Sequence, residues 1–437
     1  MNPSLISIDL STRFQTIENF GGSDAWSCQF VGKWPDAQKK AIADLLFSSD
    51  LDTNGKPLGI GLSLWRFNVG AGSAQQGESS GIADEWRRAE SFIGSDGEYD
   101  WNLQAGQMWF LDAAKKHGVR QFLAFVNSPP VNITINGKAF ATNGQPNLST
   151  QNFDAFAEYL VNVVQGVKQK IDVTFTYISP VNEPQWDWSD GGQEGTPFNN
   201  EDIAGIVTAL DAALTRENLP SKITIVEAGK YDYLYSVADK PNRGNQIDAF
   251  FDPASDLYIG DLPSIENVIM GHGYFTTSPF SKAAAIRNKL RDKVAGVKGL
   301  KLWQSEYCIL GDNSGTINGE HRDLGIKPAL YVARVIHNDL VNANASAWHW
   351  WTTVSAYDYK DGLIYVDKHK SEGNFESSKL LWAVGNFSRF IRPGSYRIAA
   401  DCDDPEVLVS AYVNPHSQEL ITVLINPAPN PKKVKLQ

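Results

Sequence analysis

Eight apolar segments alternate with segments of helical periodicity along the first 355 residues of this 437-residue chain. Each apolar segment is rich in β-branched and aromatic residues and ends in polar side chains, which is typical of a buried strand followed by a loop and a helix. The expected strands cover residues 19–26, 58–69, 121–127, 173–178, 222–227, 265–275, 299–308 and 345–354. The expected helices cover residues 37–47, 107–117, 153–168, 202–214, 283–294 and 328–342. This number of alternating elements predicts an α/β fold, a (β/α)8 TIM barrel.

A doubly wound sheet is the alternative architecture for alternating strands and helices. However, no Gly-x-Gly-x-x-Gly segment opens a helix after the first strand, so a dinucleotide-binding sheet lacks its usual fingerprint. The barrel is therefore the favoured fold, and an oxidoreductase built on a doubly wound sheet is disfavoured.

The pattern changes after residue 355. A helix is expected over 377–390, and residues 395–400, 406–413 and 419–425 then alternate like antiparallel strands. Three strands are too few for a stable β-sandwich, so we expect the N-terminal strand to complete it. The predicted domains are a catalytic barrel over 18–385 and a small side β-sandwich built from 1–17 plus 386–437. Whether that sandwich is complete in this chain stays open.

The segment Val173–Trp188 places a carboxylate where a barrel keeps its chemistry. Its first half reads as a buried strand, and Pro180 and Pro184 cannot donate to a sheet ladder, so the strand should end before Glu183. Catalytic residues of parallel barrels lie at the carboxyl ends of the strands, and the two Trp residues after Glu183 could stack on sugar rings. The alternative is an ordinary carboxylate on a surface loop.

A second glutamate occupies the same kind of position. In Trp303–Tyr307 the apolar run stops at Ser305, and Glu306 ends the strand. Cleavage of a glycosidic bond needs two carboxyl groups that flank it, and the strand ends of a barrel converge on one face. Alone, Glu306 could be a surface carboxylate, but its pairing with Glu183 favours a catalytic pair.

Composition narrows the class of partner. A formal net charge of −11 argues against nucleic acid or an anionic membrane and suits a neutral carbohydrate substrate. Aromatic residues make up 11% of the chain, which leaves some for a sugar platform beyond those of the core. The three cysteines fit no metal pattern or disulfide framework and are expected to be buried thiols. We expect no metal, no cofactor, no membrane insertion and a monomer.

The N-terminal residues do not settle the location of the protein. The start, Met1–Leu5, lacks the basic and apolar regions of a signal peptide. We expect a secreted, periplasmic or cell-surface protein whose signal peptide has been removed, and a cytoplasmic location stays open.

Several motifs together resemble glycoside hydrolase family 30, a group of retaining (β/α)8 enzymes with a side β-sandwich. The resemblance runs over nearly the whole chain. It is carried by Phe20-Gly21-Gly22, Trp65-Arg66-Phe67-Asn68, Ser128-Pro129-Pro130, Ser179-Pro180-Val181-Asn182-Glu183-Pro184, His272-Gly273-Tyr274, the Glu306 strand and Asn386-Phe387-Ser388-Arg389-Phe390-Ile391-Arg392-Pro393-Gly394. The Asn-Glu-Pro step is shared by several barrel glycosidase families, whereas the last segment is much more particular.

The resemblance implies roles for five residues. Glu183 is expected to be the general acid/base and Glu306 the nucleophile, while Asn182 binds the substrate 2-hydroxyl. Arg66 and Tyr274 are expected to contact Glu306 and keep it ionised and oriented. A structural ion pair for Arg66 and a core position for Tyr274 are the alternatives.

Further substrate contacts are predicted with less support from the motifs. His272 is a candidate for a sugar hydroxyl, although a buried histidine with satisfied hydrogen bonds fits equally well. Asp24 and Trp26 follow the first strand and could reach the non-reducing sugar. The aromatic candidates for stacking are Trp186, Trp188, Trp350 and Trp351. Because side chains alternate along a strand, either Trp348 and Trp350 or His349 and Trp351 face the barrel interior, and Trp351 at the strand end is preferred.

Two departures from the family pattern bear on specificity. Many relatives carry a Trp after Ser-Pro-Pro, but this chain has Val131-Asn132 there. An insert between Gly72 and Trp101 follows the second strand, so it should overhang the active face and shape the choice of substrate.

The predicted function is a retaining glycoside hydrolase that cleaves β-linked glycans by double displacement. Xylan, β-1,6-glucan and β-1,6-galactan, as polysaccharide or oligosaccharide, are the substrate classes expected from the resemblance. The alternative is a non-catalytic carbohydrate-binding protein on a glycosidase scaffold, which retention of both glutamates disfavours.

Overall fold

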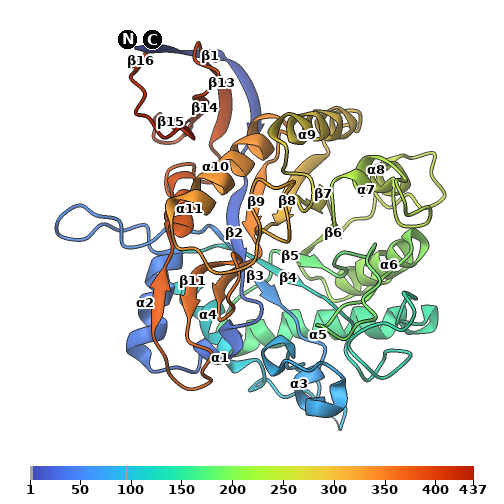
Figure 1. Ribbon diagram of the computed structural model, residues 1–437. Coiled ribbons are helices and arrows are strands. Elements are labelled where there is room, and N and C mark those ends of the chain that lie inside the picture. The colour runs from blue at the N-terminus through green and yellow to red at the C-terminus, as the bar shows by residue number, and fades with distance from the viewer. Residues whose placement is uncertain (1–2, 95) are drawn as a thin grey trace.

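A closed barrel of eight parallel strands forms the centre of the molecule (Figure 1). The computed structural model describes residues 3–94 and 96–437. The barrel strands follow chain order: β2 (Asn19–Ser23), β3 (Leu64–Asn68), β4 (Gln121–Phe125), β5 (Tyr177–Ser179), β6 (Lys222–Ala228), β7 (Ile265–His272), β8 (Lys301–Glu306) and β9 (Ala347–Trp350). The barrel closes where Asn19 of β2 pairs with Ala347 of β9. The predicted (β/α)8 fold is confirmed.

Helices surround the barrel, as the periodicity predicts. They are α1 (Cys28–Val31), α2 (Asp36–Phe47), α3 (Ser73–Gln76), α4 (Ala105–Lys116), α5 (Phe153–Ile171), α6 (Asn200–Arg216), α7 (Asp232–Tyr235), α8 (Gln246–Phe251), α9 (Phe280–Ala295), α10 (Ile326–Val341) and α11 (Lys379–Ser388). α5 shows the principle, because Phe156, Leu160 and Val163 lie on one face and are all buried against the strands. Within the described residues, none of the helices combines the length and the apolar character that a membrane crossing needs.

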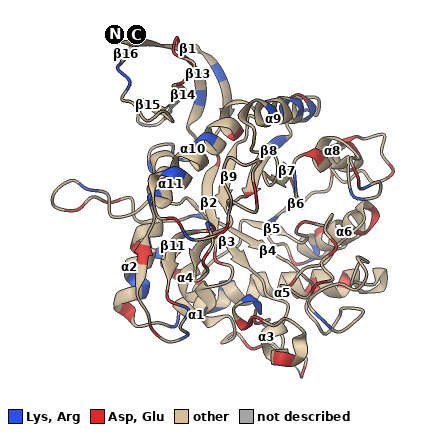
Figure 2. Cartoon of the chain, viewed as in Figure 1, with Lys and Arg blue, Asp and Glu red and all other residues tan. Residues whose placement is uncertain are grey.

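Two apolar cores fill the barrel region. One lies between strands and helices, and a smaller one fills the interior of the barrel. The interior core is Leu64, Leu123, Val268, Met270, Trp303 and Ala347. Figure 2 shows that charged residues lie mostly on the outer helices and loops, whereas the barrel strands are largely uncharged. Charged side chains on a strand therefore mark special positions.

The N- and C-terminal strands form a separate five-stranded sheet at one side of the barrel (Figure 1). Its order is β15 (Leu420–Ile425), β14 (Leu408–Val413), β13 (Tyr396–Cys402), β1 (Ser4–Thr16) and β16 (Val434–Leu436). The predicted union of the N-terminal strand with the C-terminal strands is thus confirmed, and these strands make one sheet. β1 pairs antiparallel with β13 and parallel with β16.

Some boundaries differ from the sequence prediction. The strand predicted over 345–354 breaks at Trp351, and a three-stranded sheet that was not predicted begins there. That sheet is β10 (Thr352–Ser355), β11 (Gly362–Val366) and β12 (Phe375–Ser377). Residues 173–176 are not in a strand, although Val173 and Phe175 are buried. Their apolar character reflects burial in the core rather than strand pairing.

Candidate active site

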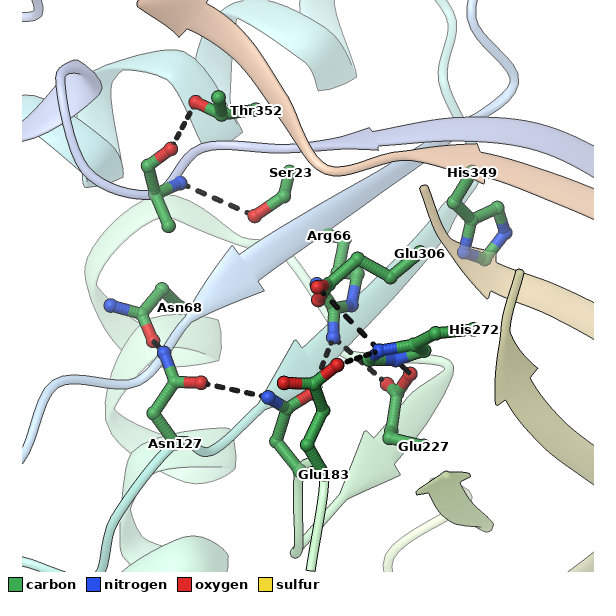
Figure 3. A network of polar contacts seen from close by, with 12 residues as sticks. Ser23, Arg66, Asn68, Asn127, Glu183, Glu227, His272, Glu306, His349 and Thr352 are labelled. Atoms are coloured by element: carbon green, nitrogen blue, oxygen red, sulfur yellow. Dashed lines mark hydrogen bonds and ion pairs between the residues drawn. The ribbon is translucent and has the colours of Figure 1, made fainter. Parts of the chain in front are cut away.

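Charged side chains from β3, β6, β7 and β8 and from the loop after β5 meet at one end of the barrel (Figure 3). Glu306 is the last residue of β8, and His272 is the last residue of β7. A register shift between Gly271 and His272 sets His272 opposite Glu306 in the β7–β8 pairing. Such an irregularity re-aims a side chain, and it turns His272 toward the glutamate.

Glu183 and Glu306 approach each other closely. One carboxyl oxygen of Glu183, one of Glu306 and a ring nitrogen of His272 all lie within 4.8 Å of one another. Retaining glycosidases separate their two carboxyl groups by about 5–5.5 Å, whereas inverting enzymes keep about 6.5–9.5 Å for a water molecule. The short separation matches a pair in which one carboxylate attacks the sugar directly.

Arg66 on β3 holds the nucleophile candidate in place. Its Nη1 donates to Glu306 Oε2 at 2.8 Å, and its Nη2 donates to Asn182 Oδ1 at 3.1 Å. The guanidinium is fully buried and lies 3.5 Å from the centroid of the Phe125 ring. Arg66 therefore does two things: it forms a buried ion pair with Glu306, and it orients the Glu306 carboxylate in the site.

A chain of three amides orients Asn182. Because Arg66 can only donate, Asn182 must present its oxygen to Arg66 and its nitrogen to Asn127. Asn182 Nδ2 donates to Asn127 Oδ1 at 3.0 Å, and Asn127 Nδ2 donates to Asn68 Oδ1 at 3.2 Å (Figure 3). Among the described residues, Asn127 is the acceptor for Asn182 Nδ2, which leaves its second hydrogen for a ligand.

Tyr274 fixes the other oxygen of Glu306. Its hydroxyl donates to Glu306 Oε1 at 3.0 Å. Burial, together with the nearby Cys308 and Glu306, raises the pKa of Tyr274 well above its usual value. The hydroxyl therefore keeps its proton and remains a donor to the carboxylate.

His272 bridges two glutamates. Its Nδ1 lies 2.8 Å from Glu183 Oε1, and its Nε2 lies 3.0 Å from Glu227 Oε2. Burial acts to lower the pKa of His272, but the carboxylates of Glu306, Glu183 and Glu227 outweigh it and raise the pKa to about 10. Both ring nitrogens consequently carry protons at neutral pH and donate to the two glutamates.

Glu227 is a site residue that the sequence analysis did not name. It lies in β6, fully buried, and its Oε1 is 3.2 Å from Arg66 Nη2. Burial acts to raise its pKa, but the Arg66 and His272 cations lower the pKa of Glu227 to about 2. The signal was present, because Glu227 ends its apolar run just as Glu183 and Glu306 end theirs.

The backbone at two of these glutamates is strained. Glu183 has a φ of 44° and Glu227 a φ of 56°, in the left-handed region that residues with a Cβ rarely adopt. The Glu183 amide donates to the Glu227 carbonyl at 2.8 Å, and Trp188 Nε1 donates to the Glu183 carbonyl at 3.0 Å. Unusual backbone conformations of this kind gather at functional sites.

The cluster holds three carboxyl groups against two cations, Arg66 and His272. Burial raises the pKa of Glu306, and the charges of His272 and Arg66 oppose that rise. Interacting groups of this kind titrate as a unit, so the carboxyl groups share any proton that the cluster holds. An acid and a carboxylate side by side are what general acid catalysis beside a nucleophile requires.

The three groups Glu183, His272 and Glu306 are also of the kind that can hold a metal ion. Here His272 donates to Glu183 and carries its own positive charge between the glutamates.

The glutamate pair opens into a cavity of about 730 Å³. Aromatic and acidic side chains dominate its walls. The lining includes Trp26, Arg87, Asn182, Glu183, Trp186, Asp187, Trp188, Asp190, Tyr274, Phe275, Glu306, Cys308, Trp351, Tyr357, Asp358 and Asp361. A cavity of this size accommodates a small ligand, and its aromatic walls suit sugar rings.

Comparison with known proteins identifies the family. The sequence profile described as O-Glycosyl hydrolase family 30 matches residues 3–365. The chain belongs to glycoside hydrolase family 30. It is a glycoside hydrolase that acts on β-linked glycans, and the alternative of a non-catalytic carbohydrate-binding protein is disfavoured.

Three relatives illustrate the range of this family. The chain is 24% identical to the endo-beta-1,6-galactanase of Hypocrea rufa, over 96% of this chain and 81% of that protein. It is 25% identical to the glucuronoxylanase XynC of Bacillus subtilis, over 72% of this chain and 62% of that protein. A solved structure described as a conserved exported protein from Bacteroides fragilis has 33% identity and a TM-score of 0.92, over 99% of this chain and 91% of that one.

The fold shows which of the Trp residues predicted to stack on sugars reach the cavity of this glycosidase. Trp26, Trp186, Trp188 and Trp351 all line the cavity. The prediction that Trp350 could stack on a sugar is wrong. Trp350 is fully buried, packs on Trp348 with ring centroids 6.2 Å apart and donates from Nε1 to the main-chain oxygen of Asp361. His349 packs against Trp303 of the interior core.

Asp24 lies beneath the site rather than in the cavity wall of the family 30 enzyme. Its Oδ1 accepts a hydrogen bond from the Asn68 amide at 2.8 Å, and only 1% of the residue is exposed. Burial raises the pKa of Asp24 to about 7. Asp24 Oδ1 thus holds the end of β3, while no described residue donates a hydrogen bond to its Oδ2, so the direct sugar contact expected for Asp24 stays a prediction.

Proposed function

We propose that this glycosidase cleaves neutral β-linked polysaccharides by double displacement, with Glu306 as the nucleophile and Glu183 as the general acid/base. The observation that carries the proposal is the close approach of the two carboxyl groups, within 4.8 Å at the wall of the cavity. That separation leaves no room for the water that an inverting enzyme places between sugar and base.

In the first step the Glu306 carboxylate attacks the anomeric carbon. Glu183 gives its proton to the glycosidic oxygen as the bond to the leaving sugar breaks, and the glycone is left as an ester on Glu306. Arg66 and Tyr274 each hold one oxygen of Glu306, so the carboxylate enters the reaction already oriented.

In the second step Glu183, now a carboxylate, takes a proton from a water molecule. The water oxygen attacks the anomeric carbon, the ester bond to Glu306 breaks, and both glutamates return to their starting forms. Asn182 donates to the sugar 2-hydroxyl, an interaction that strengthens as positive charge develops on the ring. His272 holds Glu183 in position through its 2.8 Å hydrogen bond.

A neutral substrate follows from the charges of the cavity. Six carboxyl groups line it, Glu183, Asp187, Asp190, Glu306, Asp358 and Asp361, and Arg87 is the cation of the lining among the described residues. A polysaccharide that carries many carboxylates would be repelled. β-1,6-Galactan is the first substrate to test, since the Hypocrea rufa galactanase aligns with 96% of this chain, followed by β-1,6-glucan and xylan.

Stereochemistry tests the proposal directly. Proton NMR of the first product formed from the best substrate should show the β-anomer, because two inversions restore the starting configuration. An α-anomer as the first product would contradict double displacement. Glu320→Gln, a change at an exposed glutamate, is the matched control for the variants of Glu183 and Glu306. It should have the activity of the wild type and form the same anomer.

We also propose that the enzyme acts outside the cytoplasm as a monomer. The Bacteroides fragilis relative with 33% identity is described as exported, and polysaccharides are too large to enter a cell intact. Fractionation of the source organism with an antibody against this chain, and light scattering of the purified protein, test the two statements. A purely cytoplasmic signal or a stable dimer would contradict them.

A further inference from the structure

Arg87, a cation in the cavity wall, makes no ion pair with any described residue. Arg87 ends the short 3-10 helix Glu85–Arg87, inside the insert that follows β3. Its guanidinium carbon lies 4.9 Å from the Trp26 ring centroid and 5.1 Å from the Tyr357 ring centroid. Within residues 3–94 and 96–437, no carboxylate lies within ion-pair distance of it. The two rings thus hold a flat set of hydrogen-bond donors against the cavity.

The acidic neighbours of Arg87 are already engaged elsewhere. Asp84 Oδ2 accepts from the Tyr357 hydroxyl at 3.0 Å and from Lys368 Nζ at 2.8 Å. Glu85 pairs with Lys370 at 2.6 Å. These contacts anchor the insert and orient Tyr357, and they leave the guanidinium for a ligand.

Asp361 offers an acceptor in the same cavity. It lies between β10 and β11, only 7% of it is exposed, and no described residue donates a hydrogen bond to its Oδ1. Its position is fixed because Trp350 Nε1 donates to its main-chain oxygen at 2.6 Å. Burial raises the pKa of Asp361 to about 6, while Ser355, Arg87 and Arg322 oppose that rise. At neutral pH it is therefore mainly an ionised acceptor, and a buried acceptor without a donor is costly.

Arg87 lies beside one of two aromatic groups in the cavity lining. Trp26 and Trp351 pack together there with ring centroids 5.1 Å apart, whereas Trp186 and Phe275 form a separate aromatic pair at 6.2 Å. Trp186 belongs to the Glu183 loop, and Glu183 protonates the departing sugar in the proposed mechanism. The aromatic group with Trp26 and Trp351 is therefore the one available for the sugar that stays on the enzyme.

We propose that Arg87 and Asp361 bind hydroxyl groups of the neutral sugar retained on the enzyme and select that sugar over an acidic one. This inference rests on the proposed function, since it assigns one part of the same cavity. Arg87 donates to hydroxyl oxygens, Asp361 accepts from a hydroxyl, and the aromatic rings cover the sugar face. A sugar carboxylate would be repelled by the carboxylates of Asp361 and Asp358. This repulsion would cancel its attraction to Arg87.

Three variants separate binding from packing. Arg87→Met keeps an apolar stem between the two rings but removes every donor, and Arg87→Lys keeps the charge but loses the planar fork. Asp361→Asn keeps the shape and removes the charge. Thermal unfolding of each variant checks that the fold is intact, and a midpoint near that of the wild type is expected for all three.

The measurement is kcat/KM on the neutral β-glycan that the wild type cleaves best. Arg87→Met and Asp361→Asn should each lower kcat/KM by about 10- to 100-fold, because each removes a hydrogen bond that involves a charged group. Arg87→Lys should fall between the wild type and Arg87→Met. On a substrate whose retained sugar lacks the hydroxyl that is bound, the variants and the wild type should be equal.

The outcomes are distinguishable. An active wild type with unchanged kcat/KM in folded Arg87→Met and Asp361→Asn overturns this inference and leaves the proposed function intact. A loss in Arg87→Met confined to glycans with an acidic sugar would show that Arg87 binds a carboxylate, which also overturns it. A wild type inactive on every neutral β-glycan overturns the proposed function itself.

Discussion

Two buried arginines in this protein differ in what surrounds them. Arg287 of α9 donates to Asp339 Oδ1 at 2.6 Å, and Asp339 also accepts from Trp348 Nε1 at 2.9 Å and from the Tyr231 hydroxyl at 3.0 Å. Arg66 instead faces Glu306 and Glu227, with His272 beside them. Both arginines are fully buried.

The two clusters differ in their balance of charges and in whether they open into a cavity. The Arg287 cluster pairs one cation on α9 with one carboxylate on α10, and both groups are fully buried. The Arg66 cluster has three carboxyl groups for two cations and opens into the cavity. A balanced, enclosed pair serves stability, whereas an excess carboxyl group beside a cavity can hold a proton for catalysis. Burial of an arginine alone does not tell the two uses apart.

The largest expected contrast comes from removing one carboxylate in each cluster. Glu306→Gln should lower kcat by about 10³-fold or more while the fold is retained, since the nucleophile is lost. Asp339→Asn should leave kcat per folded molecule unchanged but lower the free energy of unfolding by about 3–5 kcal/mol, because Arg287 stays buried without its partner. Kinetics and denaturant unfolding measure the two effects. Near-normal kcat in Glu306→Gln would contradict the assignment of Glu306 as the nucleophile. Glu183→Gln should lower kcat by as much as Glu306→Gln does.

Alkaline pH should weaken the Arg66 cluster selectively. The pKa of His272 is about 10 in the folded protein and ordinarily 6.5, so its stabilisation is complete below pH 6.5 and is lost as pH rises toward 10. The free energy of unfolding should therefore fall over this window, by at most about 1.4 kcal/mol for each pH unit from this group. His272→Gln should show a shallower fall in the same denaturant titration. Equal slopes for the two proteins would contradict the charged state of His272.

Glu227→Gln tests whether this glutamate positions the catalytic groups. His272 and Arg66 each lose a carboxylate partner, so kcat should fall by about 10- to 100-fold, the size of a lost charged hydrogen bond. The alkaline limb of the kcat profile should also move to lower pH, because His272 then holds its proton less strongly. Glu227→Asp should restore part of the activity. An unmoved pH profile would leave Glu227 with a structural role alone.

The smallest contrast is expected from two tyrosines that each donate to a carboxylate. Tyr274→Phe removes the donor to Glu306 and should lower kcat by about 10-fold with little effect on unfolding. Tyr231→Phe removes the donor to Asp339 and should lower the free energy of unfolding by about 1–3 kcal/mol with kcat unchanged. Thermal melts and initial rates on the same preparations make the comparison. A reversed pattern would mean that the two clusters have been assigned the wrong uses.

The barrel could be predicted from local patterns. A short apolar run in the sequence predicts each of the eight strands, and the number of such runs equals the number of strands in the barrel. The positions of Glu183 and Glu306 follow from the same rule, since both stand where an apolar run stops. Glu227 obeys the rule too, but nothing in its own segment shows that it faces Arg66 rather than solvent.

Other features depend on residues far apart in the chain. Alternation along the strand places Trp350 and Trp351 on opposite faces, but only the folded chain shows that Trp350 is the core residue and Trp351 the cavity residue. Arg87 and Asp361 come from two loops whose sequences match no strand or helix pattern. Apolar periodicity encodes which face of an element is buried, and it does so within a few residues. Which side chains meet depends on how the barrel closes and where its loops return, and those long-range contacts exist only in the folded chain.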